Sequence, residues 1–251
     1  MANWSNRNAA VSRRLVLAFL CVWANVAGAA DITENFDNVT DLASKGWFMK
    51  NLSDPLGVTG WFQGNADLYV FDAQAGPVNS YLAANFENVA DVGTISNWAI
   101  TPTNVYHNGD TFSFWTRTET ASEWGDRMEV RMSTNGASVD TGSTALSVGD
   151  FSTLLLSINP DMVTTGYPDD WTKYTITLSG LAGATTGRIA FRYFVTDAGP
   201  NGDFGNYIGI DTLQITTVPE PSTYALAAIG VLIAGVSGRR RRKFRITRGE
   251  A

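Results

Sequence analysis

The stretch Arg188-Ile189-Ala190-Phe191-Arg192-Tyr193-Phe194-Val195 decides the fold class of this chain. Apolar and polar residues alternate along much of it, and this pattern predicts the inward-pointing side chains Ile189, Phe191, Tyr193 and Val195. The same two-residue period recurs at 128–133, as Met-Glu-Val-Arg-Met-Ser, and at 173–178, as Lys-Tyr-Thr-Ile-Thr-Leu. This period is typical of antiparallel strands that bury one face and leave the other in water.

Turn sequences separate these stretches: Asn-Gly at 108–109 and 135–136, Ser-Gly at 179–180, and Gly-Pro-Asn-Gly at 199–202. Charged residues make up only 17% of the chain, and no stretch between 31 and 217 forms a convincing long amphipathic helix. The expected fold class is therefore all-β, a jelly-roll β-sandwich of two sheets over residues 31–217.

The N-terminus is expected to be a secretory signal peptide over residues 1–30. Arginines precede an apolar stretch at 15–26, and small residues follow at 27–30, which predicts a cut after Ala29 or Ala30. The alternative is an uncleaved anchor helix, but the stretch is shorter than the ~20 residues of a usual span. Because the single cysteine, Cys21, lies inside this stretch, the mature chain is expected to lack disulfides and thiolate chemistry.

Charge is distributed unevenly along the chain. Residues 31–218 carry 22 acidic and 8 basic side chains, a balance of −14, whereas residues 219–251 carry 7 basic and 2 acidic ones. An acidic domain is repelled by nucleic acid and by anionic membrane surfaces, so no nucleic-acid partner is expected. The acids suit divalent cations or solubility alone.

The C-terminal tail has three parts in a fixed order. The motif Val218-Pro219-Glu220-Pro221 comes first, a hydrophobic helix is expected at about 222–238, and a basic block closes the tail: Arg239, Arg240, Arg241, Arg242 and Lys243. As a helix, 18 residues reach about 27 Å at ~1.5 Å per residue, just enough to cross a thin hydrocarbon layer. The basic block favours a short cytoplasmic tail at 244–251, with the acidic domain outside.

This three-part order resembles the PEP-CTERM sorting signal of exported proteins from Gram-negative bacteria that make exopolysaccharide. The resemblance implies processing by an exosortase, a membrane-embedded cysteine-type transpeptidase, that recognises Pro219-Glu220-Pro221. It also implies the export machinery and, transiently, the inner membrane as partners, followed by the cell surface or the extracellular matrix, where exopolysaccharide is a further candidate partner. A tail anchor that is never cut is the alternative.

The region before the tail resembles the choice-of-anchor J domain, which is similar to cleaved-adhesin and MAM-type jelly rolls. The residues that carry this likeness are Glu34-Asn35-Phe36-Asp37, Gly46-Trp47, 97–102, 112–117 and 207–211. The resemblance implies a non-enzymatic adhesion or binding module without catalytic residues. It also implies a structural calcium where the first and last strands meet, held by Glu34 and Asp211 with Asp37 assisting; solvated or capping carboxylates are the alternative.

A polysaccharide-binding or glycosidase-like domain is the rival interpretation. Glycosidases need two carboxyl groups that face each other across a cleft, and Glu123-Trp124-Gly125-Asp126 places an aromatic residue beside two acids. Trp124 and Trp61 are the candidate glycan contacts, because both lie in stretches that look exposed.

The remaining marked residues are expected to be structural. The arginines expected on outward strand faces, paired with acids, are Arg117, Arg127, Arg131 and Arg192. The aromatic residues expected mostly in the core are Trp98, Phe112, Phe114, Trp115, Phe191 and Tyr193. His107, the only histidine, is expected in a solvent-facing turn, with no cysteine or second histidine to support a zinc site or a catalytic triad.

Overall fold

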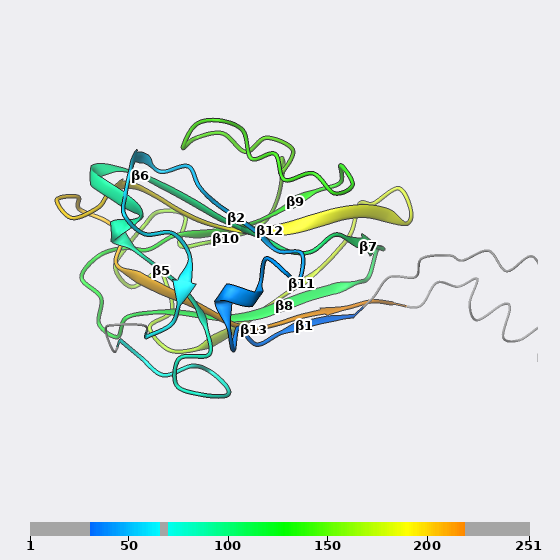
Figure 1. The fold of residues 1–251 in the computed structure, drawn as a ribbon, viewed down its shortest axis with the longest axis horizontal. Helices are drawn as coiled ribbons and strands as arrows, with labels where there is room; N and C mark the ends of the chain where they lie inside the picture. The colour runs from blue at the N-terminus through cyan, green and yellow to red at the C-terminus, as the bar shows by residue number, and fades with distance from the viewer. Residues whose placement is uncertain (1–30, 66–69, 219–251) are drawn as a thin grey trace, which may run out of the picture.

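The computed structural model describes residues 31–65 and 70–218, and within them the expected all-β sandwich is confirmed. Two antiparallel sheets face each other as two layers (Figure 1). The helical elements of the described part are two single 3-10 turns, η1 (Val39–Asp41) and η2 (Phe86–Asn88). The predicted signal peptide, the hydrophobic helix at about 222–238, the basic block and the 244–251 tail lie outside the described residues. The residues that the structure describes include no candidate membrane-spanning helix.

The first sheet has its strands in the order β11 (Thr172–Thr177), β8 (Thr111–Thr118), β13 (Tyr207–Thr216), β5 (Leu82–Asn85) and β4 (Phe62–Gln63). Strand β1 (Ile32–Glu34) also pairs with β13. The second sheet has the order β10 (Thr153–Ile158), β9 (Met128–Ser133), β12 (Thr185–Ala198), β6 (Val89–Ile100) and β2 (Phe48–Asn51). Strand β3 (Asp54–Leu56) pairs with β6, and β7 (Asn104–Tyr106) pairs with β12.

The core lies between the sheets, and the alternation of β12 supplies much of it. Ile189, Phe191, Tyr193 and Val195 are fully buried, as predicted. Phe191 packs against rings of the facing sheet, with centroids 5.5 Å from Phe112 and 4.9 Å from Phe114. Burial of such rings is the main stabilising contribution available to a domain whose described residues include no cysteine.

The outer face of the second sheet is also buried, which the two-residue alternation does not predict. The connection 134–152 between β9 and β10 folds over it, and Phe151 packs on Trp98 at 5.7 Å between ring centroids. The arginines are outward and paired, as predicted, but Arg192 is only 1% exposed. Its Nη1 lies 3.1 Å from Oε2 of Glu129, and its guanidinium stacks 3.7 Å from the Phe194 ring centroid.

Glu129 pairs with three arginines on the covered outer face of the second sheet. Its carboxylate lies 2.7 Å from Arg127 and 2.6 Å from Arg131, in addition to the contact with Arg192. Burial acts to raise the pKa of Glu129, but the three guanidinium groups outweigh it and lower that pKa below its ordinary value. One buried anion therefore pairs with three cations, and two of them, Arg131 and Arg192, also donate to carbonyl groups of the connection 134–152.

The strand register defines two ends of the sandwich. Thr111 pairs with Thr216 and Thr118 pairs with Ile208, so the end of β8 lies beside the start of β13. We call the end where β13 stops the terminal end, because β1 starts and β13 ends there, at the right of Figure 1. The opposite, distal end carries the connections 119–127, 159–171 and 199–206. The ten residues of β13 separate the two ends by about 30 Å at ~3.3 Å per residue.

Candidate functional site

Trp124 is an exposed aromatic residue at the distal end. Its side chain is 45% exposed, on the connection 119–127 between β8 and β9. Ser122 Oγ donates to the Trp124 carbonyl at 2.8 Å, and the Gly205 amide donates to the Gly125 carbonyl at 3.1 Å. An aromatic face held on a braced loop can stack on a sugar ring without a large loss of conformational entropy.

Asp126 accepts the hydrogen bonds that hold the C-terminal part of the connection 119–127. Its Oδ1 accepts from the Tyr193 hydroxyl at 2.5 Å and from the Asn206 amide at 2.8 Å, and its Oδ2 accepts from the Thr118 hydroxyl at 2.5 Å. The carboxyl group is fully buried, and this burial raises its pKa above the ordinary value. Glu123 is exposed instead, so the two acids of the 123–126 group do not face each other across a cleft.

Acidic side chains are frequent at the distal end, which also carries Trp124. The exposed ones are Asp91, Glu119, Glu123, Asp161, Asp169, Asp170, Asp197 and Asp203. On the cationic side, Arg117 is nearly buried, and its Nη1 lies 3.8 Å from Asp170. The distal end therefore disfavours anionic ligands and suits neutral ones or ligands bridged by cations.

Trp61 is a correction to the sequence-based prediction. Its side chain is only 8% exposed and belongs to the main core cluster, so it is not available to stack on a sugar. The next residue, Phe62, begins β4, which pairs with β5 and packs against Tyr207 at 5.9 Å between ring centroids. The sequence around Trp61 resembles an exposed loop, because β4 has only two residues and is too short to show an alternation of apolar and polar side chains.

A cluster of aromatic side chains that sequence reasoning missed covers the outer face of the first sheet: Phe62, Phe71, Tyr81, Trp171 and Tyr207. Phe71 lies 5.1 Å from Tyr81, 5.5 Å from Trp171 and 5.4 Å from Tyr207, measured between ring centroids. The Arg117 guanidinium lies 4.5 Å from the Phe71 centroid. Because Phe71, Tyr81 and Tyr207 are at most 8% exposed, the cluster closes this face rather than opening it to a ligand.

Gly209 on β13 makes that close packing possible. A Cβ atom added there would lie 2.8 Å from Phe71, 2.9 Å from Trp171 and 3.0 Å from Tyr81. The absent side chain lets the rings lie directly on the strand. A glycine in the middle of an alternating strand was the one sequence signal for this cluster.

Glu34 and Asp211 lie on the neighbouring strands β1 and β13. Both carboxylates, however, already accept hydrogen bonds from other groups of the domain. Lys45 Nζ donates to the two oxygens of Glu34 at 3.1 and 2.9 Å, and the Phe36 amide donates at 3.0 Å. Asp211 accepts from the Ala75 amide at 3.1 Å, and burial raises the pKa of its carboxyl group to about 6.

Other oxygens lie around the same turn. A Cβ atom on Gly76 would be 3.5 Å from both Asp37 Oδ1 and Ser80 Oγ, and this buried hydroxyl has no hydrogen-bond partner. In the described part, however, no group of three or more His, Cys, Asp or Glu side chains is arranged to hold a metal ion. A calcium ion takes six to eight oxygens, so the set fits only if Lys45 leaves Glu34. Calcium at Glu34 and Asp211 stays a prediction.

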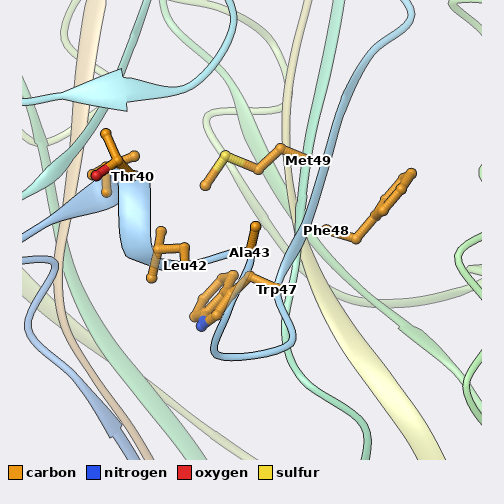
Figure 2. A pocket seen from close by; sticks show the side chains of 7 residues that line it. Thr40, Leu42, Ala43, Trp47, Phe48 and Met49 are labelled. Atoms are coloured by element: carbon orange, nitrogen blue, oxygen red, sulfur yellow. The ribbon is translucent and has the colours of Figure 1, made fainter.

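An apolar pocket of about 290 Å³ lies between η1 and β2. Leu42, Trp47 and Met49 lie around it in Figure 2, whereas Phe48 points to the opposite side of the strand and is 38% exposed. Thr40 is the polar side chain of its lining. The pocket offers volume but no group that would orient a polar ligand.

The last described residues, just after β13, are hydrogen-bonded to the domain and also belong to the tail. Thr217 donates through its amide to Asp31 Oδ1 at 2.8 Å, and the Val218 amide donates to Asp110 Oδ1 at 2.7 Å. Pro219, Glu220 and Pro221, together with the basic block 239–243, lie outside the described residues. The expected sorting motif therefore starts directly at the terminal end of the domain.

Comparison with known proteins gives a tail match and a fold match. Residues 217–242 match the family model of the PEP-CTERM protein-sorting motif, one residue before the expected bounds at each end. No curated protein matches the sequence. Among solved structures, the K3 cleaved adhesin domain of Lys-gingipain from Porphyromonas gingivalis W83 is 19% identical, with a TM-score of 0.50, over 76% of this chain and 100% of that domain. The K2 cleaved adhesin domain of Lys-gingipain is also 19% identical, with a TM-score of 0.50, over 75% of this chain and 100% of that domain.

At these identities the likeness shows the fold alone, and it confirms the predicted jelly-roll class. The tail match has a different consequence, because a sorting signal of this kind marks a protein that is exported. The chain thus carries a PEP-CTERM sorting signal directly behind a domain with the jelly-roll-like fold of the cleaved adhesins.

Proposed function

We propose that this protein is an exported, non-catalytic binding module that an exosortase-like enzyme releases from the inner membrane to the cell surface or the extracellular matrix of a Gram-negative bacterium. The observation that supports it most is the sorting motif at 217–242, which begins where the last strand ends.

The fold gives the proposed module a direction. The tail leaves at the terminal end, and Trp124 lies at the distal end, about 30 Å away along the ten residues of β13 at ~3.3 Å per residue. A membrane-tethered precursor would therefore present Trp124 away from its attachment. That placement supports binding through the connections of the distal end.

The ligand that best suits the distal end is a neutral polysaccharide. Trp124 supplies an apolar ring, and the neighbouring Glu119 and Glu123 supply carboxylate acceptors for sugar hydroxyl groups. The exposed acids would repel sulfated or uronic polymers. Glycosidase chemistry has less support, because both carboxylate oxygens of Asp126 accept hydrogen bonds from buried donors.

The sorting proposal is tested by producing the full chain with and without its exosortase and measuring the C-terminal mass of the extracellular form. Cleavage near Pro219-Glu220-Pro221 should remove the basic block 239–243 only when the enzyme is present. An extracellular form that keeps the basic block would contradict the proposal.

The binding proposal is tested by retention of the processed protein on neutral and on anionic exopolysaccharide. Trp124→Ala should abolish retention on the neutral polymer, whereas Phe48→Ala, which removes an exposed aromatic residue far from the distal loops, should not. Equal retention of the two variants would refute a role for Trp124. New reducing ends in the polymer would favour the rival, a polysaccharide-active enzyme.

Calcium is proposed as a structural ion near Asp211, with Glu34, Asp37 and the buried Ser80 hydroxyl as further ligands. Its support is the unpartnered hydroxyl and the meeting of the first and last strands. Thermal melting in calcium and in chelator tests it, with Asp211→Asn as the matched variant. An identical melting temperature in both buffers would count against the ion.

A further inference from the structure

We propose that Asp110 holds the start of the sorting signal against the folded domain, so that the processing enzyme reaches its motif only after Thr217 and Val218 have left Asp31 and Asp110. The inference rests on the proposed function, since it concerns the rate of sorting cleavage. It makes Asp110 a positioning residue for that reaction, one that never touches the enzyme's reacting atoms.

Asp110 lies at the terminal end and binds the first residues of the tail. We call the hydrogen bonds of Asp110 and Asp31 to Val218 and Thr217 the clasp. The Asp110 side chain is fully buried; Oδ1 accepts from the Val218 amide at 2.7 Å, and Oδ2 accepts from the His107 amide at 2.7 Å. Its backbone carbonyl accepts from the Leu178 amide at 2.8 Å, which ties the turn to the end of β11. His107 lies beside the clasp and is only 16% exposed, so the prediction of a solvent-facing histidine is wrong.

Two hydrogen bonds from Thr217 hold the same segment. Thr217 donates through its amide and its hydroxyl to Asp31 Oδ1, at 2.8 and 3.0 Å. The Val218 side chain lies 3.5 Å from the position that a Cβ atom on Gly109 would take. Residues 217 and 218 are thus part of the folded domain and part of the matched sorting motif at once.

An enzyme that cuts a peptide binds it as an extended strand and pairs with backbone groups on both sides of the scissile bond. Here the backbone before Pro219 already donates to Asp31 and Asp110. Because Val218 directly precedes Pro219, a groove that pairs with the backbone before the motif must also take up the Val218 and Thr217 amides. The clasp must therefore open before the motif is bound.

The effect on cleavage follows from the strength of the clasp. A short hydrogen bond from an amide to a carboxylate is stronger than one between neutral groups, and its loss makes local opening easier. Removing the Asp110 carboxylate should raise the initial rate of cleavage about tenfold, which corresponds to about 1.4 kcal/mol of opening free energy.

The test is the initial rate of C-terminal cleavage of the full chain, produced together with its exosortase and followed by pulse-chase and mass measurement. Asp110→Ala opens the clasp. A second variant inserts Gly-Ser-Gly-Ser between Val218 and Pro219, which leaves the clasp intact and supplies slack without touching the core. Asp161→Ala, which removes an exposed acid at the distal end, is the matched control.

Both the Asp110→Ala variant and the spacer variant should be cut about tenfold faster than the original chain, the two changes combined should give no further gain, and Asp161→Ala should match the original chain. The spacer variant decides the matter if Asp110→Ala folds poorly. A spacer variant cut at the original rate, or more slowly, overturns the inference while the sorting proposal stands. Absence of enzyme-dependent cleavage in every variant, the original included, would instead reject the sorting proposal.

Discussion

Replacing Gly209 by alanine tests whether the aromatic cluster closes the outer face of the first sheet. The added Cβ atom would lie 2.8, 2.9 and 3.0 Å from atoms of Phe71, Trp171 and Tyr81, closer than carbon atoms pack. Those rings also contact one another, at centroid distances of 5.1 Å for Phe71 with Tyr81 and 5.8 Å for Tyr81 with Trp171, so none can retreat alone.

The expected cost follows from overpacking. Forcing a methyl group into a filled site typically costs about 1–3 kcal/mol, whereas alanine in place of glycine at an unstrained site stabilises by about 0.4–1 kcal/mol. Gly209→Ala should therefore lower the free energy of unfolding by about 1–3 kcal/mol, a fall of roughly 2–12 °C in melting temperature for a domain of this size.

Urea unfolding followed by tryptophan fluorescence measures this change, because Trp171 belongs to the cluster. The matched control is Gly60→Ala, where a Cβ atom would meet nothing within 4 Å, and which should be neutral or stabilising. Phe71→Leu placed in the Gly209→Ala background should recover part of the loss by making room. A Gly209→Ala protein as stable as the Gly60→Ala control would refute the reasoning and would show a loosely packed face able to open to a ligand.

Two further predictions concern the buried acids. Glu129→Ala should cost about 3–5 kcal/mol in urea unfolding, because it leaves Arg192 buried without its anion, and Glu129→Met combined with Arg192→Met should cost much less; equal losses would contradict this. Burial raises the pKa of Asp126, so the folded domain binds its proton before the unfolded chain does, and this acid adds stability as the pH falls towards 3.8. The original protein should therefore gain stability relative to Asp126→Asn between pH 7 and pH 4, and a constant difference would exclude the effect.

The sequence predicted the inward face of β12 but not its outer face. Alternation identifies Phe191 and Tyr193 as core residues, because each strand has only two faces. It cannot show that a connection of nineteen residues covers Arg192, since that depends on where the loop 134–152 packs. The same limit explains Trp61, which looked exposed from its neighbours and is buried by elements distant in sequence.

The candidate sites were predictable to different degrees. The tail could be read directly, because its motif, its apolar run and its basic block are contiguous and each has a local physical role. Trp124 was also identifiable, as an aromatic residue in a polar turn. The clasp at Asp110 was not, since Asp110 and Val218 are 108 residues apart and meet only through the pairing of β8 with β13.

Strand β13 connects the two ends of the proposed module and determines how it would carry load. It is paired with β8 over seven register positions, and with β5 and β1 besides. Hydrogen bonds between antiparallel strands lie perpendicular to the strands, so a force along β13 shears many of them at once. A ligand held at the distal Trp124 and a tether at Thr217 would pull along this strand direction. The pairing of β13 with its neighbours would thus distribute the force over the sheet. It would do so while the precursor remains anchored through the tail at the terminal end.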